Sequence, residues 1–157
     1  MFKSLTATPD IAQIPYRGTG PAITDLVAGQ IPVGIVGVTG QVLELHRAGK
    51  LRVHAVTSPA RLTAASELPT AAEPGFPGMT VTGSIGLLAP AGTAVEIIEQ
   101  IAQATRKAVA EPGYRQMLID AGMEAPLNSG PETFRDALAA DVALWAPVVR
   151  SLGLKLD

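Results

Sequence analysis

The sequence predicts an α/β fold in which helices alternate with the strands of a parallel or mixed sheet. Apolar β-branched runs and segments of helical periodicity follow one another in the order strand, helix, strand, helix, strand up to residue 57. Hydrophobic residues make up 47% of the chain but aromatic residues only 4%, so Ala, Val, Leu and Ile must form the core. The 157 residues could build one domain or parts of two.

The elements of the first half follow from apolar spacing and from the glycines that end them. Ile23, Leu26 and Val27 recur at offsets of three and four, which predicts a short amphipathic helix that Gly29 stops. Gly49 ends the next helix in the same way. The predicted elements are a helix tail at residues 2–5, a strand at 11–15, a helix at 22–28, a strand at 33–38, a helix at 42–48 and an alternating, β-branched strand at 51–57.

The second half holds more helix than its strands can cover. A Pro- and Gly-rich loop at residues 58–79 contains one helical turn at 70–73, and an apolar extended segment follows at 81–88. Thr93 with Glu96 three residues later predicts a capping box for a helix through residue 110. Two further helices are predicted. The first spans 113–121, with Pro112 before it and Gly122 after it. The second runs from after the Ser-Gly-Pro-Glu segment at 129–132 to about residue 152, and its apolar face carries Phe134, Leu138, Val142, Trp145 and Val149.

Composition excludes several classes of function. The net charge is −2 and the basic residues are scattered, so nothing favours nucleic acid as a partner. The chain has no cysteine, which removes disulfides and thiolate chemistry. His46 and His54 have no carboxylates at ligand spacing, so we expect no metal site and no cofactor. No serine stands in a nucleophile motif, and no catalytic residue is predicted.

Two side chains are assigned structural roles. Asp25 is expected in the first turns of its helix, where a carboxylate complements the helix dipole. Trp145 lies on the apolar face of the last helix, so we expect it to pack in a core.

A Gly-rich turn before the second helix is the main candidate binding feature. Gly18 and Gly20 permit backbone conformations closed to other residues, and Pro21 suits a first helical turn. Such a turn directs free backbone N–H groups and the positive end of a helix dipole at one point, where a carboxylate or phosphate can bind. The same pattern also occurs in turns that bind nothing, and both interpretations stay open from the pattern alone.

Several blocks along the chain resemble one receptor family. The run from Ile14 to Gln30 is similar to its (Val/Ile)-Pro-Tyr-(Lys/Arg)-Gly and Pro-Ala-x-x-Asp-Leu-x-x-Gly-Gln motifs. The other matching blocks are residues 48–52, 55–58, Arg61 with 68–70 and 73–75, 86–93, 131–134, 145–149 and 153–155. On these residues the chain resembles the C-terminal half of solute receptors of tripartite tricarboxylate transporters, the Bordetella uptake gene (Bug) type.

The resemblance implies a fold similar to class II periplasmic binding proteins, in which two α/β lobes hold a carboxylate ligand between them. Residues 1–82 would then be part of lobe two. Residues 83–157 would be a crossover strand and C-terminal helices that belong with an absent first lobe, which explains the surplus of helices.

The resemblance also implies a ligand site at two strand-to-helix turns. The residues carried over by position are Tyr16, Arg17, Gly18, Thr19, Gly20 and Ala22 in the first turn, and Gly37, Val38 and Thr39 in the second. The chain departs from the family pattern near Gly37, at Ser84–Ile85 and at Ala94.

The implied function is a receptor for a small carboxylate-bearing metabolite that works with membrane transporter subunits, or the truncated remnant of one. A fragment that binds no ligand and self-associates as a homo-oligomer is the second hypothesis, and a small enzyme or regulatory domain the third. The family is periplasmic, but residues 1–6 contain no long apolar stretch, so the chain as written is expected to stay in the cytoplasm.

Overall fold

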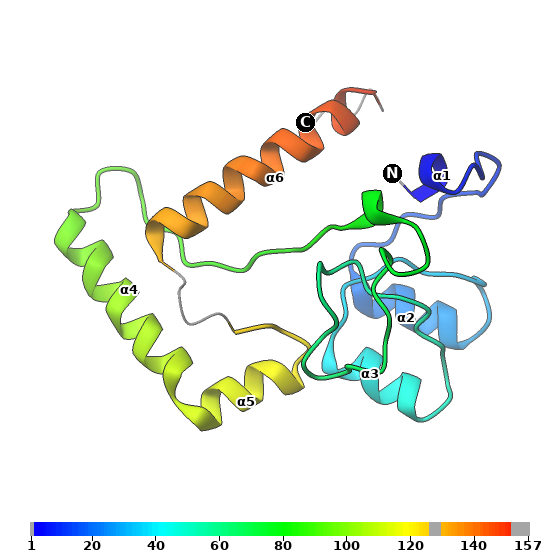
Figure 1. The fold of residues 1–157 in the computed structure, drawn as a ribbon, viewed down its shortest axis with the longest axis horizontal. Coiled ribbons are helices and arrows are strands. Elements are labelled where there is room, and N and C mark those ends of the chain that lie inside the picture. Colours follow the sequence, from blue (N-terminus) through cyan, green and yellow to red (C-terminus); the bar gives the residue numbers. More distant parts are fainter. Residues whose placement is uncertain (1, 126–129, 152–157) are drawn as a thin grey trace. The chain divides into compact units, whose positions relative to one another are not determined.

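The computed structural model describes residues 2–125 and 130–151, and its helices are drawn in Figure 1. The predicted end of the last helix, at about residue 152, lies outside these ranges. The helices are α1 (Phe2–Leu5), α2 (Thr19–Val27), α3 (Gly40–Arg47), the 3₁₀ turn η1 (Pro77–Met79), α4 (Val95–Ala110), α5 (Pro112–Asp120) and α6 (Pro131–Ser151). All the predicted helices form within about three residues of their expected starts.

The chain divides into two units. Unit 1 comprises Met1–Thr82 with Gln116–Glu124, and unit 2 comprises Gly83–Arg115 with Ala125–Asp157. Unit 1 is therefore made of two separate stretches of chain, and α5 begins in unit 2 and ends in unit 1.

Unit 1 has a hydrophobic core built on α3 and the chain that follows it. Its buried members are Leu43, Val56, Leu62, Ala65 and Leu68, with Val38, Val53 and Ala64 packed against them. α3 buries the adjacent residues Val42 and Leu43, and Leu43 belongs to this core. The core fixes the start of α3, which is one of the two turns where the sequence predicts a ligand.

Helices α2 and α3 end as the glycines predict. Gly29 after α2 has φ 71° and Gly49 after α3 has φ 66°, both in the left-handed region. In each case the backbone N–H of the glycine donates to a carbonyl of the last turn, Leu26 O at 3.1 Å and His46 O at 3.0 Å. The sequence signal for these ends is confirmed.

The predicted strands are wrong as regular elements in the described part of the chain. Only isolated bridges occur there, Val56 with Thr70 in parallel and Leu62 with Ala65 in antiparallel. Segments 51–57 and 81–88 meet at one point, where Val81 N donates to Thr57 O at 2.8 Å. A segment with a strand-like sequence forms a regular strand only when it pairs with a neighbouring strand along its length. In the described part of the chain these segments find no continuous partner.

Unit 2 contains α4, the start of α5, α6 and an extended segment at residues 83–89, which Figure 1 draws as open chain between η1 and α4. The predicted capping box of α4 is wrong. Its N-cap is Ala94, and Thr93 Oγ1 instead donates to Pro90 O at 2.8 Å. The loop before the helix therefore satisfies the threonine hydroxyl locally.

Apolar side chains of unit 2 stay exposed. Ala125 is its single described residue classed as buried. On α6, Leu138, Val142 and Trp145 are 42%, 67% and 36% exposed, so the expected core position of Trp145 is wrong. The apolar spacing predicted the helix correctly, but these three side chains of that face remain largely uncovered.

Candidate functional site

The N-terminus of α2 presents unpaired backbone donors. Gly18 is the N-cap residue of α2 and has φ 150°, a conformation essentially restricted to glycine. Because glycine has no side chain, it cannot accept a capping hydrogen bond from the helix. Within the described chain, the amides of Gly18, Thr19 and Gly20 have no hydrogen-bond partner. Pro21 has no amide hydrogen to satisfy. The positive end of this helix is therefore open to an acceptor.

The two predicted turns lie close together in unit 1. A Cβ atom built on Gly37 would lie 3.7 Å from Thr19 Oγ1. The glycine thus keeps a side chain out of the space beside the start of α2. Thr19 is half-buried, and its hydroxyl lies beside Gly37 of the second turn.

The start of α3 is already satisfied by the chain. Thr39 is its N-cap, and Thr39 Oγ1 accepts from Val42 N at 3.4 Å. Gly40 N donates to Ala121 O at 3.2 Å. A Cβ atom on Gly122 would lie 3.0 Å from Val38 O, so the chain after α5 packs directly on this turn. Of the two predicted turns, the first offers free donors and the second is capped.

Tyr16 and Arg17 differ in what they contact. Tyr16 Oη donates to Asp25 Oδ2 at 2.8 Å, and this hydrogen bond, with smaller contributions from burial and from the Asp25 charge, raises the pKa of Tyr16. The Arg17 side chain is exposed, and no described residue pairs with it. Arg17 is therefore the cation beside the turn that remains available to an anion.

The expected role of Asp25 needs correction. Asp25 lies in the last turn of α2, where a carboxylate does not complement the dipole, because the helix begins three residues earlier than predicted. It binds Tyr16 and ties the extended chain before the turn to the helix. Ala22 is 6% exposed, so its methyl group is buried, and its place in the binding turn stays a prediction.

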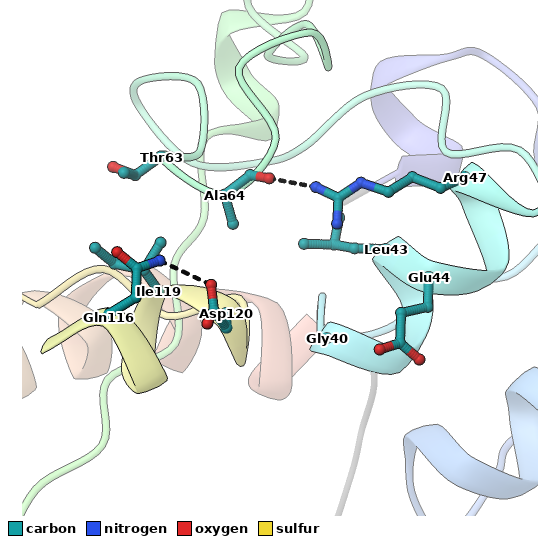
Figure 2. A pocket seen from close by; sticks show the side chains of 9 residues that line it. All are labelled: Gly40, Leu43, Glu44, Arg47, Thr63, Ala64, Gln116, Ile119 and Asp120. Atoms are coloured by element: carbon teal, nitrogen blue, oxygen red, sulfur yellow. Dashed lines mark hydrogen bonds between the residues drawn. The ribbon is translucent and has the colours of Figure 1, made fainter. Parts of the chain in front are cut away.

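A hollow of about 590 Å³ in unit 1 was not predicted from the sequence, because its walls come from α3, the 62–65 loop and α5. Figure 2 shows Arg47 reaching the Ala64 carbonyl, at 2.6 Å, and Gln116 beside Asp120, at 2.8 Å. Outside the drawn set, Glu124 accepts from both Thr63 N and Thr63 Oγ1. Most polar groups around the hollow are thus paired with one another.

Neither histidine marks a metal centre. His46 Nδ1 accepts from Val53 N at 3.3 Å, so the imidazole holds the chain after α3, and His54 is exposed. Across residues 2–125 and 130–151 no three metal-ligating side chains converge.

A Gly-rich turn that leads into an open helix N-terminus is typical of the lobes of periplasmic binding proteins. Two solved structures place the chain in that class. "Structure of a periplasmic transporter" superposes with a TM-score of 0.82 and 34% identity over 99% of this chain and 51% of that chain. "Structure of periplasmic binding protein BugD" gives 0.77 and 27% over 97% and 51%.

The family follows from the sequence comparisons. Residues 3–154 match the tripartite tricarboxylate transporter family receptor, and the chain belongs to this family. It is 34% identical to Protein BugT of Bordetella pertussis (strain Tohama I), over 93% of this chain and 44% of the relative. It is 33% identical to the UPF0065 protein in the tcbD-tcbE intergenic region of Pseudomonas sp. (strain P51), over 91% and 42%.

These findings confirm the resemblance and the α/β binding-protein fold, and they agree with the prediction of a receptor and not an enzyme. The chain spans about half the length of the relatives it matches. Among the helices of the described residues, none is long and apolar enough to cross a membrane.

Proposed function

We propose that this chain supplies one half of a carboxylate site in a periplasmic solute receptor that delivers a small acid to tripartite tricarboxylate-type membrane subunits. The observation that carries the proposal is the open start of α2, with unpaired amides at Gly18, Thr19 and Gly20. A carboxylate accepts two or three such N–H groups and gains from the helix dipole.

The residues around the start of α2 leave room for a small anion and add positive charge beside it. Gly37 leaves space beside Thr19 Oγ1, which can donate to a second carboxylate oxygen. Arg17 is exposed next to the same turn and adds positive charge. At the second turn the chain itself pairs the amides of Gly40 and Val42, so fewer donors remain at the start of α3.

Gly20→Asp tests the proposal. A Cβ on Gly20 meets nothing within 4 Å, and an aspartate near a helix N-terminus is favourable for folding. The new carboxylate repels a bound one. We expect Gly20→Asp to keep or raise the melting temperature while abolishing the shift that a panel of di- and tricarboxylates gives the unmodified chain.

Gly113→Asp is the matched control, because Gly113 is also the second residue of its helix and its Cβ position is also open. Its carboxylate response should equal that of the unmodified chain, and Gly20→Asn should keep most of the response. A panel that shifts neither the unmodified chain nor a longer receptor containing it would refute the site.

The alternative is a fragment that associates with itself and binds no ligand. The exposed apolar face of α6 favours it, because such surface promotes association. Light scattering at micromolar concentration measures the molar mass of the chain in solution. The mass of a monomer would rule out self-association.

A further inference from the structure

The hollow in unit 1 shares no described lining residue with the start of α2, where the carboxylate site is proposed. Its volume of about 590 Å³ lies within the range of about 300–1,000 Å³ that is typical of sites for small organic molecules. Its walls come from both stretches of unit 1, because α3 and the 62–65 loop belong to the first stretch and residues 116–120 to the second. A molecule bound there would contact both stretches.

The first turn of α3 packs closely on the end of α5. A Cβ atom on Gly40 would lie 2.7 Å from Asp120 O. Glu44 follows Gly40 by four residues in α3, so both lie on the same face of the helix. The side chains of Glu44 and Asp120 both line the hollow, and Figure 2 draws them on either side of Gly40. Two carboxylates from different helices therefore meet at one hollow.

The side-chain oxygen atoms of the hollow are only partly used by the chain. In the described residues, the Glu44 carboxylate accepts no hydrogen bond and forms no ion pair. Asp120 accepts from Gln116 Nε2 through Oδ1, at 2.8 Å, and its Oδ2 has no described partner. The Oε1 atom of Gln116 likewise accepts no bond from the described chain. Three acceptor groups from two helices therefore remain available at the hollow.

These free acceptors favour a cation over an anion. A primary ammonium carries three N–H donors and no acceptor, which matches the three free acceptor groups. An acid would face two carboxylates, and Arg47 at the same hollow already donates from Nη2 to Ala64 O at 2.6 Å. A divalent metal ion needs about six oxygen ligands, and no three metal-ligating side chains converge in residues 2–125 and 130–151. The chemistry of the hollow therefore fits an organic amine.

We propose that the hollow is a separate binding site, which takes a primary alkylamine with a short aliphatic chain. The ammonium group pairs with Glu44 and Asp120, and Gln116 Oε1 accepts its third hydrogen. The aliphatic chain lies against Ile119 and Ala64, which line the hollow and are half-buried. Because both carboxylates are exposed, each ion pair contributes modestly, and the aliphatic chain supplies much of the affinity. This site selects the opposite charge to the carboxylate site and does not depend on it.

NMR titrations with butan-1-amine, methylamine and butan-1-ol, at neutral pH and constant ionic strength, test the proposal. We expect saturable shifts of the Gly40 and Ile119 amide signals with butan-1-amine. Methylamine should bind at least about tenfold more weakly because it lacks the aliphatic chain, and butan-1-ol should give no saturable shift because it lacks the charge. A bound amine links α3 to α5, so the Gly40 amide, which donates to Ala121 O, should exchange at least about threefold more slowly at saturation.

Glu44→Gln and Asp120→Asn each remove one charge and keep the shape of the side chain, and asparagine retains the Oδ1 atom that accepts from Gln116. Each variant should weaken butan-1-amine binding at least about threefold, and the double variant at least about tenfold. Glu67→Gln is the matched control, because Glu67 is an exposed carboxylate of unit 1 that does not line the hollow. It should bind the amine as the unmodified chain does.

Four results would overturn the proposal. They are the absence of a saturable shift with butan-1-amine, equal shifts with butan-1-ol, equal shifts with magnesium ions at the same concentration, and a double variant that binds as tightly as Glu67→Gln. Gly20→Asp, which tests the carboxylate site, should leave amine binding unchanged. Failure of the amine site is therefore distinguishable from failure of the carboxylate site.

Discussion

Both units contain amphipathic helices, but within the described residues only unit 1 buries the apolar faces of its helices. In unit 1, α3 is eight residues long and buries Val42 and Leu43 in a core with the 53–68 chain. In unit 2, α4 is sixteen residues long and strongly amphipathic, yet none of its residues is buried. Length and periodicity therefore do not decide burial. A helix buries its apolar face only where the same chain returns to cover it.

The largest effect expected from this contrast is the loss of a core leucine. Leu43→Ala in unit 1 removes a side chain that is 2% exposed and should lower the free energy of unfolding by about 2–5 kcal/mol. Leu138→Ala in unit 2 removes a side chain that is 42% exposed and should change the free energy of unfolding by less than about 0.5 kcal/mol. Urea titration followed by circular dichroism compares the two. Equal losses would mean that α6 is covered in solution.

A second, smaller contrast concerns helical glycines. A Cβ on Gly40 would lie 2.7 Å from Asp120 O, a backbone atom that cannot move alone. Gly40→Ala should therefore destabilise unit 1 by about 1–3 kcal/mol. Gly113→Ala, at an open position of unit 2, should instead stabilise by about 0.4–1 kcal/mol. Melting temperatures that move in the same direction for both variants would contradict the close packing of α3 on the chain after α5.

The smallest effect is the pH response of an exposed ion pair in unit 1. Arg61, and next the Thr70 amide, lower the pKa of Glu73 from its ordinary 4.5 to about 2. The pair therefore stabilises the fold above pH 4.5, and this contribution is lost as the pH falls from 4.5 towards 2. The urea midpoint of the unmodified chain should decline more steeply in that window than the midpoint of Glu73→Gln. Parallel pH profiles would show that the pair does not couple to folding.

Local features of the fold were predictable, and partner-dependent features were not. Gly29 and Gly49 set helix ends because a left-handed residue is a local requirement. The strand at 33–38 and the core position of Trp145 depend on what lies opposite, and a periodic pattern does not say whether that partner is present. The capping box failed at Thr93 because α4 begins one residue later than expected, with Ala94 as its N-cap, and the Thr93 hydroxyl donates to Pro90 O.

The candidate site shows the same division. Gly18 and the free amides at the start of α2 follow from the Gly-rich turn. The capping of α3 by Ala121 could not be predicted, because it joins residues about 80 positions apart. The Tyr16–Asp25 bond was missed because the helix was expected to start later. The two residues are nine positions apart, which carries no recognised sequence signal.

The hydrogen bonds from Thr63 to Glu124 have a consequence for how the chain is made. The two residues are 61 positions apart, and the whole of α4 lies between them in the sequence. Residues 1–82 leave the ribosome before the segment that completes their unit, at about 5–20 residues per second. For several seconds of synthesis, the Gly40 amide lacks its acceptor, the Ala121 carbonyl, and Thr63 lacks its acceptor, the Glu124 carboxylate. During that interval the first unit lacks the contacts that its second stretch of chain provides.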